Sequence, residues 1–259
     1  MNPVLKIVKI GGNVIDNEVT LTAFLEDFAA LSSPKILVHG GGKIATQLAT
    51  KLGVETKMVN GRRVTDQASL DVVVMTYAGL LNKKVVALLQ KNNCSAIGLS
   101  GADAGSILSR KRTHQEIDFG FVGDVDFVHS ENIHKLIQAG FTPVFCAITH
   151  DAEGHLLNTN ADTIASEVAI GMSEIYQTEL LYCFEKKGVL TDINDENSVI
   201  EHIDSQKYEA LKDNKIIADG MLPKLENCFH ALQNKVSKVI IGNPSVIGGK
   251  ETLFTTLTI

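Results

Sequence analysis

Short runs of β-branched and aliphatic residues alternate with longer amphipathic segments through most of this 259-residue chain. Near its start, a strand is predicted at 4–10 and a helix at 20–32, then a strand at 35–39 and a helix at 42–52. This order is typical of a mostly parallel sheet with helices on both faces, because parallel strands need crossover connections. Further strands are predicted at 95–99, 142–148, 179–183 and 237–241, and further helices at 66–91, 131–139, 161–171, 205–213 and 223–234. The sequence therefore predicts an α/β fold.

Two segments interrupt or divide this alternation. The stretch 104–128 is polar, contains glycine and has a strand-like pattern, so hairpins are predicted there, in a position suited to cover a ligand. Gly171 follows a predicted helix and provides a helix stop signal, after which a new series of strands and helices begins. We therefore expect an N-terminal lobe at 1–172 and a C-terminal lobe at 173–259, joined inside one continuous sheet.

Composition and charge exclude several classes of partner. The formal net charge of -6 leaves no overall positive field for a nucleic-acid backbone, so no nucleic-acid partner is expected. The first residues lack the features of a signal peptide. No apolar run reaches the roughly 20 residues of a membrane span, so we expect a cytoplasmic protein without membrane contact. The cysteines are scattered and form no closely spaced cluster with histidine, which predicts neither a metal site nor disulfides.

Two glycine-rich turns follow the first two predicted strands. Lys9 precedes Gly11 and Gly12, where backbone N–H groups can approach phosphate oxygens and the lysine adds a positive charge. Taken alone, this turn is also compatible with a tight bend beside a solvated lysine. Three glycines from Gly40 to Gly42 stand where a helix begins, and free N–H donors there favour an anion. Turns at the carboxyl ends of neighbouring parallel strands face one crevice, where open α/β sheets bind ligands.

Three known glycine-rich motifs are not matched by this sequence. A P-loop needs Ser or Thr after its lysine, but Ile44 follows Lys43. The nucleophile elbow of hydrolases, G-x-S-x-G, fails at Ala102, and the dinucleotide motif G-x-G-x-x-G fails at Ala45. These mismatches exclude a P-loop protein and argue against an esterase or a dinucleotide-binding protein.

Two basic sites are candidates for contacts with anions. Arg62 and Arg63 lie in a turn that leads into a helix capped by Asp66, and the guanidinium of one of them can bind a carboxylate with two hydrogen bonds. The alternative is two ordinary solvated arginines. Lys224 follows Pro223, which suits the first position of a helix, so the lysine falls in the first helical turn. A cation is disfavoured at that end of a helix, which indicates a compensating anion unless Lys224 is a surface lysine.

The segment 158–162 reads Asn-Thr-Asn-Ala-Asp and precedes a predicted helix. Polar side chains at alternate positions, Asn158, Asn160 and Asp162, can project into one site, where a buried aspartate could orient cations. The alternative is simple capping of the following helix by Asn160.

Seven short segments follow one another in a characteristic order along the chain. They are KIGG (9–12), HGGG (39–42), NGRRVT (60–65), GLSGADA (98–104), GFVGDV (120–125), NTNAD (158–162) and ADGMLPK (218–224). Together they resemble the acetylglutamate kinases of the amino-acid kinase family over nearly the whole chain. The resemblance implies a three-layer α/β/α sandwich. Its N-terminal lobe would bind the acylglutamate and form the dimer, and its C-terminal lobe would bind ATP.

The resemblance also implies a role for each matching residue in the substrate site. Gly41, Gly42, Arg63 and Asn158 would hold the acylglutamate, with Arg63 on its α-carboxylate. The γ-carboxylate of this substrate would attack ATP directly. A carboxylate needs no general base at neutral pH, since its pKa is about 4.3.

The same resemblance implies the groups that would act on the phosphoryl group. Lys9 and Lys224 would neutralise its oxygens, Asp162 would hold both lysines in place, and Gly11 and Gly12 would donate N–H bonds. Mg²⁺ would be bound mostly by phosphate oxygens and water rather than by protein ligands. Such an arrangement suits phosphoryl transfer, where alignment and charge neutralisation are the main tasks.

The match to the family is weakest at 183–189, where relatives usually carry an aspartate-containing turn. Lys186 or Lys187 could approach the polyphosphate there, but a solvated basic turn is the alternative. The first strand begins by Val4 without the extra N-terminal helix of arginine-inhibited relatives, so a homodimer with little arginine feedback is expected.

The expected activity is phosphorylation of N-acetyl-L-glutamate in arginine biosynthesis, with ATP and Mg²⁺. One alternative keeps this chemistry with N-succinylglutamate as substrate. A second alternative, from another class, is a catalytically silent sensor or binding protein that retains the fold. The joint presence of Lys9, Asp162 and Lys224 argues against the sensor.

Overall fold

The computed structural model describes residues 2–59, 62–214 and 221–259. Its centre is an eight-stranded sheet with the strand order β12-β14-β13-β11-β1-β2-β8-β5. Every neighbouring pair in this sheet is parallel except β13 and β14. The strands are β1 Val4–Ile10, β2 Lys35–His39, β5 Ala96–Leu99, β8 Thr142–Cys146, β11 Gln177–Cys183, β12 His202–Ile203, β13 Lys238–Gly242 and β14 Thr255–Leu257. The predicted mostly parallel sheet is confirmed.

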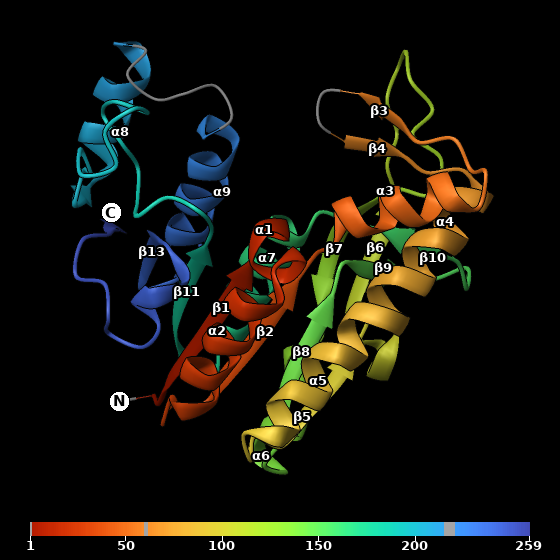
Figure 1. The fold of residues 1–259 in the computed structure, drawn as a ribbon, viewed down its shortest axis with the longest axis horizontal. Helices are drawn as coiled ribbons and strands as arrows, with labels where there is room; N and C mark the ends of the chain where they lie inside the picture. The colour runs from red at the N-terminus through yellow and green to blue at the C-terminus, as the bar shows by residue number, and fades with distance from the viewer. Residues whose placement is uncertain (1, 60–61, 215–220) are drawn as a thin grey trace.

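Helices cover both faces of the sheet, which makes three layers. In Figure 1, α2 and α5 lie in front of the sheet and α7 lies behind it. On the α7 side, α7 packs against β1, β11, α6 and α9. The helices are α1 Gly12–Asp16, α2 Glu18–Ala30, α3 Gly42–Lys51, α4 Gln67–Val74, α5 Asn82–Lys91, α6 Ser130–Gln138, α7 Ala161–Met172, α8 Ser205–Asp213 and α9 Leu222–Gln233. Each predicted helix is present, with ends shifted by about two residues at most.

The central strand β1 forms the middle of the hydrophobic core. Leu5, Ile7, Val8 and Ile10 are all fully buried, because helices cover the strand on both sides. Burial of each such side chain contributes about 1.5–3 kcal/mol relative to exposure. This packing fixes the end of β1, and therefore the lysine and glycines that follow, as a rigid part of the molecule.

A second sheet of four strands lies beyond the carboxyl ends of the main strands. Its order is β10-β9-β6-β7, and β6 and β7 form the antiparallel hairpin predicted within 104–128. The predicted strand at 142–148 is divided, because the chain leaves the main sheet after Cys146 and enters the second sheet at Ile148. The elements are β6 Ile107–Lys111, β7 Gly123–Val128, β9 Ile148–His150 and β10 Leu156–Asn158, with a separate hairpin of β3 Lys57–Val59 and β4 Arg62–Val64.

The predicted helix at 66–91 is continuous but not regular. A π-helical segment, Met75–Leu81, separates α4 from α5. The helical stretch Gln67–Lys91 is long enough to cross a membrane, and an 18-residue window within it reaches a mean hydropathy of 1.6. The expectation that no segment of this length exists was therefore wrong. Leu70 and Leu89 of this helix are buried against the core, so its apolar character has a structural explanation within the fold.

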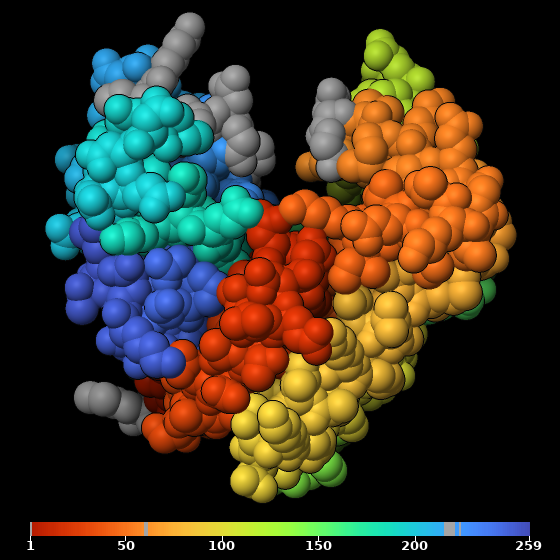
Figure 2. Space-filling model, in the orientation of Figure 1, coloured from red at the N-terminus to blue at the C-terminus, as the bar shows by residue number. Residues whose placement is uncertain are grey.

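A deep hollow opens at the carboxyl edge of the main sheet. Figure 2 shows it between C-terminal segments, in cyan and blue, and N-terminal segments, in orange. In Figure 1, α1 lies at its base, with α9 on one side and α3 on the other. The hollow thus lies where the glycine turns and polar segments of the sequence come together. Division of the chain at 172 and 173 stays a prediction.

Candidate active site

Lys9 and Asp162 form an ion pair at the carboxyl edge of the sheet. Lys9 lies near the end of β1, beside Val38 of β2 and Tyr182 of β11. Its Nζ is 2.6 Å from Asp162 Oδ1, and the two side chains are only 13% and 16% exposed. A pair with so little water around it interacts more strongly than a surface pair. The structure thus places two of the three expected catalytic residues in direct contact.

Asp162 is held in place by contacts on both sides of its peptide. The Asn160 side chain accepts hydrogen bonds from the N–H groups of Asp162, at 2.7 Å, and Thr163, at 3.2 Å. The Tyr182 hydroxyl donates to the Asp162 carbonyl at 2.9 Å. Burial raises the pKa of Tyr182 well above its usual value, so this hydroxyl remains a donor. Asn160 therefore caps α7, as one alternative predicted, and this cap helps to orient Asp162.

The first glycine turn joins β1 to α1. The N–H of Gly11 donates to the carbonyl of Cys183 at 3.1 Å, so that donor is already occupied in this conformation. Gly12 begins α1, where the first N–H groups of a helix have no partner within the helix. Lys43 reaches across from α3 and donates a hydrogen bond to the Asn13 side chain. The two glycine turns are thus neighbours, as the sequence predicted.

Lys224 lies in the first turn of α9, at its third position. Met221 is the N-cap residue, which places Pro223 second in the helix rather than first. The Lys224 Nζ lies 4.6 Å from the centroid of the Phe184 ring. Within the described part of the chain, no carboxylate lies within 4.0 Å of this ammonium group. Among the described residues, the contact that holds this cation is therefore an aromatic ring and not an acid.

The first turns of α7 and α9 lie close together around the buried thiol of Cys228. Burial raises the pKa of this thiol, the negative charge of Asp162 raises it further, and the positive charge of Lys224 lowers it. Both charges therefore act on one sulfur atom. This agrees with the packing of α7 against α9. Lys224 forms no ion pair with Asp162, whose described ionic partner is Lys9.

A cavity of about 250 Å³ is lined by all four expected substrate residues and by Asn160 and Ala161, which directly precede Asp162. Three sides are formed by glycines of the second turn, by arginines and by the segment that leads into α7. Its lining residues are Gly40, Gly41, Gly42, Met58, Arg62, Arg63, Tyr77, Arg112, Val122, Ala147, Asn158, Thr159, Asn160 and Ala161. A mixed lining of this kind, with a few polar groups that converge on an apolar hollow, is typical of a small-ligand site.

Arg63 is fixed against the first turn of α3. One terminal nitrogen donates to Thr46 Oγ1 at 2.7 Å and to the Gly42 carbonyl at 3.1 Å, and the other donates to Thr56 Oγ1 at 3.1 Å. All three partners are neutral, so the guanidinium keeps its full positive charge. A pre-oriented, uncompensated arginine in a cavity is suited to binding a carboxylate. Of the motif at 60–65, Asn60 and Gly61 lie outside the described residues.

Gly41 permits a close approach that no larger residue allows. Its φ is 156°, and a Cβ atom at this position would lie 2.2 Å from Leu81 Cδ1 and 3.1 Å from the Tyr77 ring. Both neighbours belong to the π-helical segment, which bulges toward the second glycine turn. The glycine and the bulge together set the position of the Gly42 carbonyl, to which Arg63 donates.

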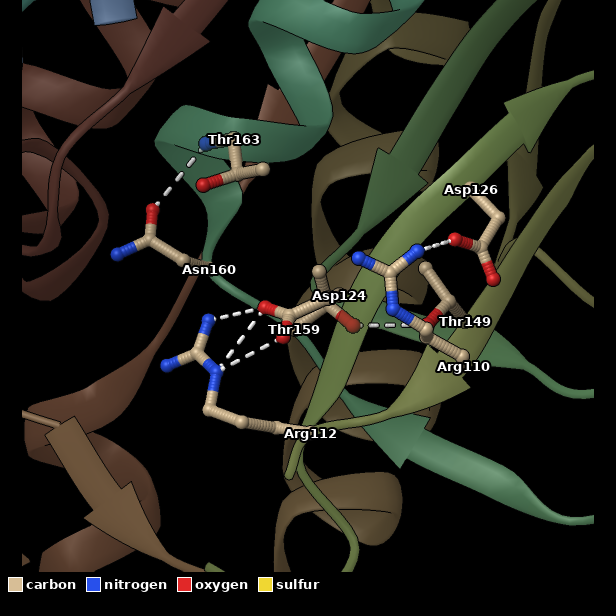
Figure 3. Close-up of polar contacts among 8 residues, drawn as sticks. All are labelled: Arg110, Arg112, Asp124, Asp126, Thr149, Thr159, Asn160 and Thr163. Atoms are coloured by element: carbon tan, nitrogen blue, oxygen red, sulfur yellow. Dashed lines mark hydrogen bonds and ion pairs between the residues drawn. The ribbon is translucent and has the colours of Figure 1, made fainter. Parts of the chain in front are cut away.

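Asn158 and the second sheet form the far wall of the cavity. The Asn158 side chain donates to Thr65 Oγ1 at 3.0 Å, and Thr149 and Thr159 share a buried hydrogen bond of 2.7 Å. Figure 3 shows these threonines beside the hairpin that carries Arg112 and its partner Asp124. The wall is therefore built from short polar side chains with few unsatisfied groups.

Several residues of this region were not singled out from the sequence. Arg112 lines the cavity, and its Nε donates to both carboxylate oxygens of Asp124, at 3.0 and 3.1 Å. Arg110 and Asp126 form a second pair on the same hairpin (Figure 3). The available signal was the pair Arg110 and Arg112, two residues apart, followed by the pair Asp124 and Asp126 with the same spacing. Phe184 offered none, since a single phenylalanine after a strand is unremarkable.

The basic turn after β11 is engaged with acids in this structure. Lys186 lies 3.2 Å from Glu196, and Lys187 lies 3.6 Å from Glu251. Both contacts fit the alternative of a solvated basic turn. Among residues 2–59, 62–214 and 221–259, no group of three or more His, Cys, Asp or Glu side chains could hold a metal ion.

His39 stabilises the second glycine turn from beneath. It is completely buried, its Nδ1 lies 2.9 Å from the Gly40 carbonyl, and its Nε2 lies 3.1 Å from Asn82 Nδ2. Burial lowers the pKa of His39 to about 4, so the ring is neutral at pH 7. Because it faces the interior, it is a structural group and not a catalytic base.

Comparisons with known proteins agree with the geometry. A family model described as the amino acid kinase family matches residues 5–243. An acetylglutamate kinase of Cytophaga hutchinsonii is 53% identical over 238 residues, which are 92% of this chain and 90% of the relative. An acetylglutamate kinase of Bacteroides thetaiotaomicron is 49% identical over 251 residues, 97% of this chain and 98% of the relative.

A solved structure supports the same fold. The crystal structure of smu.665 from Streptococcus mutans has a TM-score of 0.80 and 24% sequence identity, and the match covers 98% of both chains. The resemblance carried by the seven segments is confirmed by these matches. By its sequence and its fold, the chain belongs to the amino acid kinase family.

Proposed function

We propose that this protein transfers the γ-phosphoryl group of ATP to the γ-carboxylate of N-acetyl-L-glutamate. The relatives that cover nearly the whole chain bear the name acetylglutamate kinase. That name favours neither N-succinylglutamate as substrate nor a silent sensor. The observation that carries the proposal is the cavity lined by Arg63 and Asn158, whose wall continues through Ala161 into Asp162, the partner of Lys9.

The cavity can orient the acylglutamate through its carboxylate. Arg63 has only neutral partners and can bind the α-carboxylate, while Asn158 and the N–H groups of Gly41 and Gly42 can bind the remaining polar atoms. The γ-carboxylate would then point toward Lys9. Alignment of this kind removes much of the entropic barrier of a reaction between two molecules.

The transfer step needs charge neutralisation more than acid or base catalysis. A carboxylate oxygen forms a bond to the γ-phosphorus while the bond from phosphorus to the bridging oxygen breaks, and ADP leaves with that electron pair. Lys9 and Lys224 would neutralise the oxygens of the transferring group, and Gly12 would donate an N–H bond, with Gly11 supporting the turn. Asp162 keeps Lys9 in position through the 2.6 Å contact. A cation fixed in advance, as Lys9 is, needs no reorganisation during the reaction.

ATP and Mg²⁺ fit the groups around the hollow. Lys224 has no acidic partner among the described residues, which suits a polyphosphate as its counter-ion. Asp162 forms an ion pair with Lys9, and no carboxylate cluster is present in the described chain. The metal would therefore be coordinated mainly by phosphate oxygens. When bound, Mg²⁺ would supply additional positive charge to the phosphates.

Trapping of the acyl phosphate with hydroxylamine tests the proposal. Purified protein, ATP and Mg²⁺ should yield a hydroxamate with N-acetyl-L-glutamate, and none when ATP is omitted. Free glutamate serves as the control substrate, since it lacks the acyl group. Absence of hydroxamate with N-acetyl-L-glutamate would overturn the proposal, and faster turnover of N-succinylglutamate would change the assigned substrate.

We also propose that the lobes at 1–172 and 173–259 bind the acylglutamate and ATP respectively, and that the protein is a cytoplasmic homodimer. Met75 and Leu80, on the long helix, are 50% and 58% exposed and offer apolar surface for a second copy. Light scattering of the purified protein would test the dimer, and a monomer or hexamer would contradict it.

A further inference from the structure

The two lysines of the site are held by different kinds of partner. Lys9 is paired with a carboxylate at 2.6 Å, so the net charge of that pair is zero. Lys224 lies over an aromatic ring, which has no net charge. No acid of the described residues pairs with Lys224, so none of them reduces the positive charge that it offers to an incoming anion.

The position of Lys224 makes a stabilising partner necessary. It stands in the first turn of α9, where the helix dipole disfavours a cation, and that turn contains no acidic residue. Its Nζ lies 4.6 Å from the centroid of the Phe184 ring, within the distance at which a ring face attracts an ammonium group. In the described parts of the chain, the Phe184 ring is the contact that compensates this unfavourable position.

Phe184 is itself fixed beside the first glycine turn. Its N–H donates to the carbonyl of Gly242 at 3.0 Å, which ties it to the end of β13. A Cβ atom on Gly11 would lie 3.8 Å from the Phe184 Cβ, and the N–H of Gly11 donates to Cys183, the residue just before Phe184. The side chain is half-buried and packs against the core. The ring therefore stands on the rigid edge of the sheet, between the Gly11 turn and α9.

We propose that Phe184 is a positioning residue that holds the Lys224 ammonium near the glycine turn without cancelling its charge. This inference rests on the proposed phosphoryl transfer. A carboxylate in place of the ring would bind the lysine more strongly, and an incoming phosphate would then have to break an ion pair. A ring binds the ammonium more weakly, so the lysine can move to the phosphoryl group as negative charge develops there.

A purely structural role for Phe184 makes a different prediction from the positioning role. If the ring only fills space, an aliphatic side chain of similar size should replace it with little effect on catalysis. If the ring holds Lys224, only another aromatic ring should do so. Because Lys224 would act on the transferring group, its misplacement should lower kcat and leave the KM for the acylglutamate nearly unchanged.

The kinetic test compares Phe184→Leu with Phe184→Tyr in the hydroxamate assay. Loss of the cation–ring contact should lower kcat by roughly 3- to 30-fold in Phe184→Leu, while Phe184→Tyr stays within about 2-fold of the unsubstituted protein. Phe141→Leu, the same change just before β8 at the opposite edge of the sheet, is the matched control and should leave kcat unchanged. Equal losses in the leucine and tyrosine variants, or an unchanged kcat in Phe184→Leu, would overturn the proposal.

A second measurement does not depend on activity. Reductive methylation with ¹³C-formaldehyde labels the lysines, and the Lys224 signal is assigned by its loss in Lys224→Arg. The ring should shift this signal upfield, and Phe184→Leu should return it to the position of solvated lysines. An unshifted signal in the unsubstituted protein would refute the ring contact. A shifted signal without any hydroxamate would instead refute the proposed activity alone.

Discussion

Substitution of Gly41 by alanine should damage both stability and substrate binding. The new Cβ would lie 2.2 Å from Leu81 Cδ1 and 3.1 Å from the Tyr77 ring, far inside normal contact distances. Leu81 is only 3% exposed and Tyr77 only 6%, so neither can move out into solvent. Overpacking of this kind costs about 1–3 kcal/mol. At roughly 2–4 °C per kcal/mol for a domain of this size, the loss should appear clearly in a thermal melt.

The clash should also disturb substrate binding in the cavity. Relief of the clash requires the second glycine turn or the π-helical segment to shift, and Arg63 donates to the carbonyl of Gly42 in that turn. We therefore expect the KM for the acylglutamate to rise more than kcat falls. Urea unfolding and the hydroxamate assay measure the two effects on the same preparations.

Two further variants isolate the steric cause. Gly53 has a φ of 70°, and a Cβ atom added there would meet no heavy atom within 4 Å, so Gly53→Ala measures backbone strain without a clash. It should be less destabilising than Gly41→Ala and should leave the KM unchanged. The double variant Gly41→Ala, Leu81→Ala should lose less free energy of unfolding than the sum of the two single variants. Truncation of Leu81 removes the atom with which the new Cβ clashes. Strict additivity, or a KM unchanged in Gly41→Ala, would refute the reasoning.

Three other predictions concern single groups of the site. Asp162→Asn should lower kcat by about 100-fold, because Lys9 loses the partner that aligns it; unchanged kcat in the hydroxamate assay would contradict this. Arg63→Lys should raise the KM for the acylglutamate by roughly 10- to 100-fold with a smaller effect on kcat, as expected for loss of a charged hydrogen bond worth about 1.5–3 kcal/mol. The pKa of His39 is lowered to about 4 in the folded protein from a usual 6.5, so only the unfolded chain binds this proton between those values. Stability should therefore fall as pH drops, by about 2 kcal/mol at pH 5 relative to pH 7, and urea unfolding of His39→Gln should lack this part of the loss.

The periodicity of the sequence was sufficient to predict the main sheet and the helices that cover it. Strands buried on both faces, such as β1, are recognisable in the sequence as continuous apolar runs. The amphipathic helices between them are recognisable by their helical period. The short α1 and the edge strand β12 were missed, because a few residues carry no readable period. The π-helical segment at Met75–Leu81 was missed because its residues are as apolar as those of a regular helix.

For the site, sequence order predicted which residues gather but not how each is held. Lys9 and Asp162 do meet, yet the contact of Lys224 with Phe184 depends on where α9 packs against α7 and β13, and no local pattern encodes that. Likewise, the occupied N–H of Gly11 follows from the neighbouring strand β11, which is distant in sequence. The contacts of each site residue that depend on tertiary packing are therefore known only from the structure.

The kinetic constants of Lys224→Ala in the hydroxamate assay test the central claim most directly. If Lys224 acts on the transferring phosphoryl group, kcat should fall by at least about 100-fold, the scale of losing one fixed charge-stabilising group, with little change in the KM for N-acetyl-L-glutamate. A matched Lys186→Ala change, in the basic turn paired with Glu196, should leave both constants nearly unaltered. A rise in KM with kcat intact would contradict the proposed role, because Lys224 would then bind the ground state and not the transition state.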